Sequence, residues 1–360
     1  MHAKIGKMNY EEKYMYRCLQ LATYGAGHVA PNPMVGAVLV HNDRIIGEGY
    51  HHRFGESHAE PNAIHSVKDT SLLKESTLYV NLEPCSHFGK TPPCANLIVE
   101  KGIPRVVIGT LDPNPKVSGK GIEILRSTGI EVITGVLEDA CMQLNKHFFI
   151  WQKEKRPYVL LKWAQTRDGY IDRIRTNADT PPLQISDNIT RQLTHKVRSE
   201  NQAIMVSTNT VFLDNPSLTV RNWPGKNPIR IMLDRTGRIP LDYVIFDQTV
   251  KTLVFTENPR ENTDKINYIF LRFDDKMLHN MLKIIASQGI HSVLVEGGSS
   301  LLNSFITSGL WDEARTEVSD TTIGNGVPAP ATGTAAENVS IINKHLYFIY
   351  YNRNKKFSHE

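Results

Sequence analysis

The sequence predicts a protein of two α/β domains. Its 360 residues exceed the usual size of a single hydrophobic core. Each half alternates short apolar runs of strand length with segments of helical spacing, which is typical of layered α/β domains. Between the halves, residues 152–157 form a charged stretch that ends in proline. We therefore expect one domain at residues 1–150 and a second at residues 156–350.

The first domain is expected to contain a helix, a β-hairpin and then alternating strands and helices. Residues 11–24 have helical spacing, with Tyr14, Cys18 and Leu21 on one face. The later elements are two strands joined by a His-Asn-Asp turn, two buried strands and a helical stretch, at residues 36–40, 44–49, 78–81, 105–109 and 122–128. This order predicts a layered α/β domain.

The second domain shows the same alternation with longer connections. Five apolar runs have strand length, at residues 158–163, 203–206, 229–233, 252–255 and 293–295. Helical candidates separate some of them, at residues 188–198, 276–287 and 301–308. Because parallel strands need crossover connections of this length, we expect a mostly parallel sheet. The polar segment at residues 352–360 is expected to fray.

Composition excludes several classes of protein. Hydrophobic residues make up 40% of the chain and charged residues 22%, as in an ordinary soluble protein. No apolar run is long enough to span a membrane, and residues 1–16 do not have the pattern of a secretory signal. The net charge of +4 is mild and its Lys and Arg are scattered, which suits a small anionic ligand and does not require a nucleic-acid surface. We expect a cytoplasmic protein.

Cysteine and histidine spacing indicates a metal site in the first half. The chain has 4 cysteines, too few for a disulfide scaffold. His58, Cys85 and Cys94 offer the imidazole and thiolate ligands that zinc prefers, and three protein ligands leave the fourth position of a catalytic zinc open. Glu60 follows His58 by two residues, so on the first turn of a helix it can face the same cavity without binding the metal. There it can accept a proton from the attacking water and pass it to a leaving amine.

Other interpretations of these residues stay open at this point. His-x-Glu is a common pattern, and two separate cysteines can be ordinary buried thiols. Four further histidines are rival ligands, although an exposed or structural role is the simpler interpretation of each: His51, His52, His65 and His87. A structural zinc site with His87 as fourth ligand would leave Glu60 without a role. Pro61 fits a helix only in its first turn, where its missing N–H has no partner.

Together these motifs resemble the zinc-dependent cytidine-deaminase superfamily, whose signature is His-x-Glu followed by Pro-Cys and a second Cys. Eight residues separate the two cysteines here. With the segments at residues 31–38 and 112–117, this spacing resembles the bifunctional deaminase–reductase family of riboflavin biosynthesis, over residues 10–148. The resemblance implies a cytidine-deaminase-like domain that removes an amino group from a diaminopyrimidinone carrying a phosphoribosylamino arm. It implies one zinc held by His58, Cys85 and Cys94, proton transfer by Glu60, and a pyrimidine pocket lined by Asn32.

A candidate phosphate site lies in the second half. The strand at residues 293–295 leads through Glu296 and two glycines into the amphipathic segment 301–306. A helix beginning there would present free N–H groups to a phosphate, and the glycines would allow close approach. The segment lacks the Gly-x-Gly-x-x-Gly fingerprint of a standard dinucleotide-binding domain. Arg198 and Arg221 can clamp a substrate phosphate, although a single Arg more often lies on a solvated face, and Glu296 can face a ligand or cap a helix.

These segments, with residues 162–169 and 208–221, are similar to the reductase half of the same family. The similarity covers roughly residues 158–330 and implies a dihydrofolate-reductase-like fold that reduces the ribosyl arm to ribityl with NADPH. The residues implied to contact the dinucleotide are Ala164, Gln184, Thr210, Asp214, Arg235, Gly298, Ser299, Ser300, Leu301, Leu302, Asn303 and Ser304. Those implied to face the sugar phosphate are Pro182, Arg198, Leu218, Arg221 and Glu296. Gln184 and Pro182 stand where the family more often has Trp and Ser.

The two halves therefore predict successive reactions on one phosphorylated pyrimidine. Deamination comes first, and the product then accepts hydride from NADPH at its opened sugar carbon. We expect no nucleic-acid or membrane partner, and the resemblance suggests a homodimer or a higher homo-oligomer. The alternative is a nucleic-acid-editing deaminase with an unrelated second domain, which would require a basic groove with aromatic stacking platforms.

Overall fold

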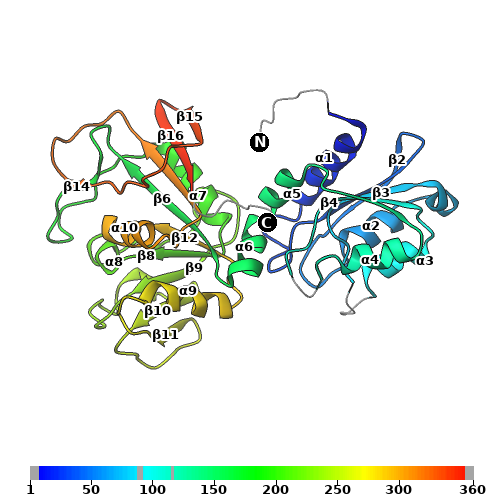
Figure 1. Cartoon of the computed structure of the whole chain (residues 1–360). Coiled ribbons are helices and arrows are strands. Elements are labelled where there is room, and N and C mark those ends of the chain that lie inside the picture. The colour runs from blue at the N-terminus through cyan, green and yellow to red at the C-terminus, as the bar shows by residue number, and fades with distance from the viewer. Residues whose placement is uncertain (1–7, 87–91, 115–116, 353–360) are drawn as a thin grey trace. The chain divides into compact units, whose positions relative to one another are not determined.

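A computed structural model describes residues 8–86, 92–114 and 117–352 of the chain. It divides into two compact units, Met1–Lys155 and Arg156–Glu360 (Figure 1). Each unit has its own sheet and its own hydrophobic core.

The first unit is built around a five-stranded mixed sheet with strand order β2-β1-β3-β4-β5. Strand β1 pairs antiparallel with β2 and β3, whereas β3, β4 and β5 run parallel. The described elements are α1 (Tyr10–Thr23), β1 (Gly36–His41), β2 (Arg44–Tyr50), α2 (Ala59–His65), η1 (Thr70–Glu75), β3 (Thr77–Leu82), α3 (Cys94–Glu100), β4 (Arg105–Thr110), α4 (Lys120–Ser127), β5 (Glu131–Thr134), α5 (Glu138–Leu144) and α6 (Lys146–Glu154). This confirms the predicted layered α/β fold.

Helices cover both faces of this sheet (Figure 1). Buried side chains of α2, α3 and α4, such as Ala63, Ile98 and Leu125, share one core cluster with alternate residues of the strands. On the opposite face α1 and α5 pack through residues such as Cys18 and Cys141. The period of two along each strand sends neighbouring side chains to opposite faces, so both faces of the sheet are buried.

Helix α1 shows how the sequence sets an element boundary. The Asn9 side chain accepts a hydrogen bond from the Glu12 N–H, and the Glu12 side chain accepts one from the Asn9 N–H, both at 2.9 Å. This capping box satisfies two backbone donors that the helix leaves unpaired. The helix consequently begins at Tyr10, one residue before the predicted start, and Tyr14, Cys18 and Leu21 are buried as predicted.

The second unit contains a nine-stranded sheet with strand order β11-β10-β9-β8-β12-β6-β13-β16-β15. The seven strands from β11 to β13 run parallel, and β16 and β15 join antiparallel at one edge, which confirms a mostly parallel sheet. Its elements are β6 (Tyr158–Gln165), β7 (Tyr170–Asp172), α7 (Asn188–Ser199), β8 (Ala203–Val206), α8 (Thr208–Asp214), β9 (Ile229–Leu233), η2 (Val244–Phe246), β10 (Thr252–Thr256), β11 (Ile266–Phe270), α9 (Met277–Ser287), β12 (Ser292–Glu296), α10 (Ser299–Ser308), β13 (Glu313–Val318), β14 (Val327–Pro328), β15 (Asn338–Ile342) and β16 (His345–Tyr351).

Two sequence expectations need correction in this region. The charged stretch at residues 152–157 is partly helical, because α6 continues to Glu154. Arg156 is buried, and its guanidinium donates two hydrogen bonds of 2.6 and 2.5 Å to the Asp312 carboxylate. Asn352 does not fray: its N–H bonds the Asp312 carbonyl at 3.1 Å, and its side chain bonds the Trp311 carbonyl at 3.0 Å. Residues 353–360 of the predicted tail lie outside the described residues.

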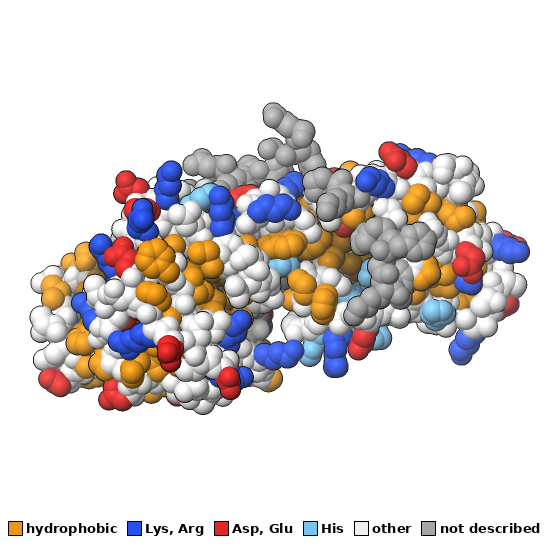
Figure 2. Space-filling model, turned by 90° about the horizontal axis from the view of Figure 1, so that it is seen from below, with side chains coloured by type: hydrophobic (Ala, Val, Ile, Leu, Met, Phe, Trp, Pro, Cys, Tyr) orange, Lys and Arg blue, Asp and Glu red, His pale blue; other side chains and the backbone are white. Residues whose placement is uncertain are grey.

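The surface shows charges of both signs. In Figure 2, Lys and Arg side chains are spread over both units with Asp and Glu among them. This face agrees with the scattered basic residues of the sequence. In the described part of the chain, no helix has the length and apolar character that crossing a membrane requires.

Candidate functional site

The first candidate site is built around the start of helix α2. His58 is the N-cap residue of this helix and has extended backbone angles, so its side chain lies just outside the first turn. Glu60 is the second helical residue and Pro61 the third. The amide nitrogens of the first turn have no partner inside a helix, so Pro61 is tolerated there as predicted.

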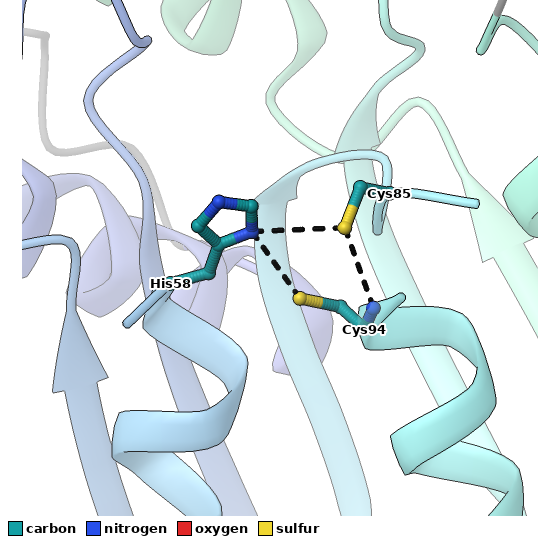
Figure 3. A group of neighbouring side chains, drawn as sticks. All are labelled: His58, Cys85 and Cys94. Atoms are coloured by element: carbon teal, nitrogen blue, oxygen red, sulfur yellow. Dashed lines mark hydrogen bonds between the residues drawn. The ribbon is translucent and has the colours of Figure 1, made fainter. Parts of the chain in front are cut away.

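The two cysteines come from the end of one strand and the start of another helix. Cys85 follows β3, and Cys94 is the first residue of α3. The Ala95 N–H bonds the Cys85 carbonyl at 3.2 Å, and the Cys94 N–H points to the Cys85 Sγ at 3.3 Å. The start of α3 therefore holds both thiols toward His58 (Figure 3).

The three side chains have the geometry of a tetrahedral metal site. His58 Nδ1 lies 3.6 Å from the Cys85 Sγ and 3.4 Å from the Cys94 Sγ. All three ligand atoms lie within 4.8 Å of one another. Zn–N and Zn–S bonds of about 2.0 and 2.3 Å at tetrahedral angles would place N and S about 3.5 Å apart. The residues present therefore fit a zinc ion with three protein ligands.

Hydrogen bonds within the cluster shift the pKa values of its three side chains. Hydrogen bonding to Cys94, aided by His58, lowers the pKa of the Cys85 thiol. The same bond to Cys85 raises the pKa of Cys94, so the two sulfurs share one proton in the metal-free cluster. The Cys85 thiolate in turn raises the pKa of His58 to about 8. Thiolate is the form of cysteine that binds metal, so the site holds one such ligand ready.

Glu60 lies beside this cluster without belonging to the ligand group. Its side chain is 3% exposed. Burial raises the pKa of the carboxyl group to about 7, assisted by the charge of Cys85 and opposed by His58. A carboxyl group in this range can both accept and donate a proton near neutral pH.

Asn32 and His51 form a hydrogen-bonded pair near the metal cluster. The Asn32 side-chain nitrogen lies 3.1 Å from His51 Nε2, and His51 Nδ1 lies 3.0 Å from the Ser57 carbonyl. Nδ1 therefore carries the ring proton, and Nε2 accepts from Asn32. Burial lowers the pKa of His51, which keeps the ring neutral. The rings of His51 and His58 are 5.4 Å apart, so Asn32 is held close to the cluster.

The rival histidines take other positions. His51 is buried with the hydrogen bonds just described, and His52 and His65 are exposed. His87 lies outside the described residues. Among the described residues, His58, Cys85 and Cys94 are the one group with metal-ligand spacing.

Two asparagines that the sequence analysis missed support the Asn32 segment. Asn81 accepts from the Gly36 N–H at 2.8 Å and donates to the Met34 carbonyl at 3.1 Å. Asn145 accepts from the Met34 N–H and donates to its carbonyl, both at 2.8 Å. Asn81 could be suspected from its place in an apolar strand, whereas Asn145 lies between α5 and α6 and gives no such signal. The bonding partners of both asparagines are distant in sequence.

The second candidate site lies at the carboxyl edge of the parallel sheet. Strands β9, β8, β12 and β6 are neighbours, so the residues that follow them meet at one edge. Ligands of open α/β sheets bind in this position. Ala164 lies at the end of β6, Thr210 and Asp214 lie on α8 after β8, Arg235 follows β9, and residues 298–304 follow β12.

Glycines open the start of helix α10. Gly297 and Gly298 have φ values of 102° and 74°, which favour glycine. A Cβ on Gly298 would lie 2.5 Å from the Ser207 Oγ, and one on Gly297 would lie 3.3 Å from Thr210. No side chain caps the helix at Gly298, so its first N–H groups have no side-chain acceptor at the N-cap. The side chains of Leu301 and Leu302 are buried in the core, so these two residues can contact a ligand only through their backbone.

The predicted phosphate contacts differ in their surroundings. Arg198 is committed to Glu296: its Nη2 lies 2.6 Å from the Glu296 carboxylate, and its Nε lies 3.1 Å from it. This partner lowers the pKa of the buried Glu296 carboxyl against the effect of burial. Arg221 is exposed and contacts the hydroxyls of Ser217 and Thr219. Of these two arginines, Arg221 is therefore the freer to reach a phosphate.

The other predicted contacts are spread around the crevice. Asp214 is held by Arg175 at 2.6 Å. Pro182, Gln184 and Arg235 are exposed, and Arg235 pairs with Glu257 at 2.8 Å. Leu218 is buried, with a left-handed backbone at φ 53°. The sequence analysis missed Arg175, whose guanidinium also pairs with Asp172 at 2.6 Å; of its two carboxylate partners, Asp172 alone is near it in the sequence.

Fold and site together define an enzyme that joins a zinc-type deaminase domain to a reductase domain. Residues 8–110 match the family described as the cytidine and deoxycytidylate deaminase zinc-binding region. Residues 157–347 match the RibD C-terminal domain.

Whole-chain relatives agree with this class. The chain is 40% identical to the riboflavin biosynthesis protein RibD of Aquifex aeolicus, over 88% of this chain and 89% of that protein. It is 41% identical to the RibD of Bacillus amyloliquefaciens, over 94% and 92%. A crystal structure of the deaminase/reductase of Thermotoga maritima, 38% identical, superposes with a TM-score of 0.82 over 94% of this chain and 97% of that one. The chain belongs to the RibD family and is a bifunctional deaminase and reductase of riboflavin biosynthesis.

Proposed function

We propose that the chain acts twice on one phosphorylated pyrimidine. The first step is hydrolytic deamination of diaminohydroxyphosphoribosylaminopyrimidine, and the second is NADPH reduction of the ribosyl arm of 5-amino-6-(5-phosphoribosylamino)uracil to ribityl. The Thermotoga maritima relative carries both activities in its name. The observation that carries the proposal is the His58, Cys85 and Cys94 cluster, in a chain whose second half matches the RibD C-terminal domain. We assign deamination to residues 1–150 and reduction to residues 156–350.

In the deaminase unit, His58, Cys85 and Cys94 would hold one zinc ion. When bound, zinc supplies a Lewis acid that makes hydroxide available near neutral pH. Glu60 would accept the proton of the attacking water and deliver it to the leaving amine, since it is buried beside the ligands without joining them. Asn32, held by His51, would hydrogen-bond the pyrimidine.

In the reductase unit, the start of α10 would receive the phosphates of NADPH on its free N–H groups. Exposed Arg221 would bind the substrate phosphate. The cofactor supplies the hydride, and the crevice would place it beside the opened sugar carbon. A cytoplasmic location, a homo-oligomer and the absence of nucleic-acid and membrane partners stay predictions from the sequence.

One assay tests the proposal. Zinc-loaded protein is given the phosphoribosylated diaminopyrimidine, and ammonia release is measured with and without NADPH. We expect ammonia in both cases and NADPH oxidation only after deamination. Metal analysis should find one zinc per chain, and Cys85→Ser or Cys94→Ser should lose most of the zinc together with ammonia release. A full zinc content in both variants would refute the assignment of Cys85 and Cys94 as ligands. Tight zinc binding by the wild type without ammonia release would favour a structural zinc site.

A further inference from the structure

We propose that Glu83 is a positioning residue for the metal ligand Cys85. This inference rests on the proposed zinc site. Glu83 lies directly after β3 and two residues before Cys85. Glu83 is buried, at 4% exposure. Among the described residues, its side-chain hydrogen bonds go neither to the metal cluster nor to the residues assigned to the substrate.

The Glu83 carboxylate accepts hydrogen bonds from three backbone N–H groups, two at the start of helix α4 and one just after β4. One oxygen accepts from the Gly121 N–H at 3.0 Å. The other accepts from the Gly119 N–H at 3.0 Å and from the Asp112 N–H at 3.2 Å. Helix α4 has Gly119 as its N-cap residue and no side-chain cap of its own. Glu83, which directly follows β3, therefore supplies the cap from outside the helix.

The hydrogen bonds of Glu83 hold the start of α4 against the Pro84 peptide, which directly precedes Cys85. A Cβ on Gly121 would lie 2.2 Å from the Pro84 carbonyl oxygen and 3.3 Å from its carbon. The first turn of α4 thus packs directly on the Pro84 peptide, which only a glycine allows. The Glu83 N–H also bonds the Thr110 carbonyl at 2.9 Å, which ties the same segment to the end of β4.

Cys85 is consequently held from two sides. Helix α3 binds its carbonyl through the Ala95 N–H at 3.2 Å. Helix α4 fixes the preceding peptide through Glu83 and Gly121. A Zn–S bond tolerates little displacement, and outer partners of metal ligands commonly change metal affinity by about 10–100-fold. Loosening α4 should therefore let the Cys85 sulfur move away from His58 and Cys94.

The test is zinc release from the full-length, zinc-loaded Glu83→Gln variant. Glutamine keeps the size of the side chain, but its amide NH₂ cannot accept from an N–H. The variant therefore loses the hydrogen bonds that one of the two carboxylate oxygens accepts. We expect zinc to pass to a chromogenic chelator at least about tenfold faster than from the wild type. The Co²⁺-substituted variant should show weakened sulfur-to-metal charge-transfer absorption. NADPH oxidation on pre-deaminated substrate, which depends on the other unit, should be unchanged.

Two further variants make the test specific. Glu48→Gln removes a carboxylate of the same unit that pairs with Arg17 at 2.7 Å, and it should release zinc at the wild-type rate. Gly121→Ala leaves Glu83 intact but forces α4 away from Pro84, and it should accelerate release as Glu83→Gln does. Wild-type release rates in folded Glu83→Gln and Gly121→Ala would overturn the inference.

The remaining outcomes are also decisive. If neither variant folds, Glu83→Asp keeps the charge and shortens the reach, and wild-type zinc release from it would overturn the inference as well. If the wild type itself binds no zinc, the proposed function fails and the role of Glu83 fails with it. If the wild type binds zinc and the variants release it normally, only the role of Glu83 fails.

Discussion

The two units build their candidate sites in different ways. The candidate metal ligands and Glu60 come from one stretch, residues 58–94, and each lies at a helix start or just after a strand. The reductase crevice collects residues 164–304 from the ends of four neighbouring strands. The candidate metal site is defined by side chains of restricted chemistry, whereas the candidate phosphate site at the start of α10 is defined by glycines and a helix start.

This difference explains why the two sites are unequally visible in a sequence. Zinc accepts few ligand types, so His58, Cys85 and Cys94 stand out by their chemistry. A phosphate on a helix start needs free N–H groups and room, which many strand–helix junctions provide. The crevice was therefore predicted mainly through family resemblance. If the two sites are also chemically separate, variants should affect one and spare the other.

We expect Glu60→Gln to separate the deaminase activity from the reductase activity more than any other variant. The amide keeps the volume of the side chain but cannot carry the proton, so deamination should fall by about 10²–10⁴-fold. Zinc content should stay at the wild-type level, since Glu60 lies outside the candidate ligand group. Reduction of pre-deaminated substrate by NADPH should be unchanged. Loss of NADPH oxidation on that substrate in the folded variant would break the two-site interpretation.

Arg221→Ala tests the substrate end of the crevice. The variant should bind phosphorylated substrate more weakly by about 1.5–3 kcal/mol, the range of a charged hydrogen bond. A dephosphorylated analogue serves as the control and should be affected much less. Steady-state KM values of the reduction step for both compounds measure the difference. Equal losses would mean that Arg221 does not bind the phosphate.

Gly298→Ala tests the cofactor end, with Gly309→Ala as a matched control. Both glycines have positive φ, at 74° and 67°, but only the Gly298 Cβ meets a neighbour, the Ser207 Oγ at 2.5 Å. Displacing the helix start should raise the KM for NADPH by about 5–30-fold, since interactions at a helix terminus are worth up to about 2 kcal/mol. Gly309→Ala should leave this KM unchanged, and ammonia release should be normal in both. A similar KM in the two variants would argue against phosphate binding at Gly298.

The smallest effect concerns stability in acid. Burial lowers the pKa of His291 to about 4, from an ordinary value of 6.5. Below pH 6.5 the unfolded chain binds a proton at His291 that the folded chain does not bind. The contribution of neutral His291 to the free energy of unfolding is therefore complete above pH 6.5 and declines as the pH falls toward 4. By linkage the loss should reach about 1 kcal/mol near pH 6.

His291→Gln removes this titration and provides the comparison. Thermal unfolding of the second unit should shift less between pH 7.5 and 5.5 in the variant than in the wild type. Parallel shifts in the two proteins would show that His291 does not contribute.

Much of the fold follows from local patterns in the chain. Strand β8 has the bounds predicted for it, and α7 differs from its prediction by one residue. The reason is that apolar periodicity and helix caps act over a few neighbouring residues. The grouping of His58, Cys85 and Cys94 was likewise predicted from residue type and spacing, and the structure brings the three side chains together. Their roles and that of Glu60 stay predictions.

The roles of residues whose partners are distant in sequence could not be predicted from local patterns. Arg156 lies in a stretch that has the composition of a linker, yet Asp312 neutralises it in the core of the second unit. A glutamate is most often exposed, yet Glu83 is buried and caps α4 from the segment that follows β3. Whether a charged side chain is exposed or buried depends on the partner that folding brings to it, because an unpaired charge is costly in the interior.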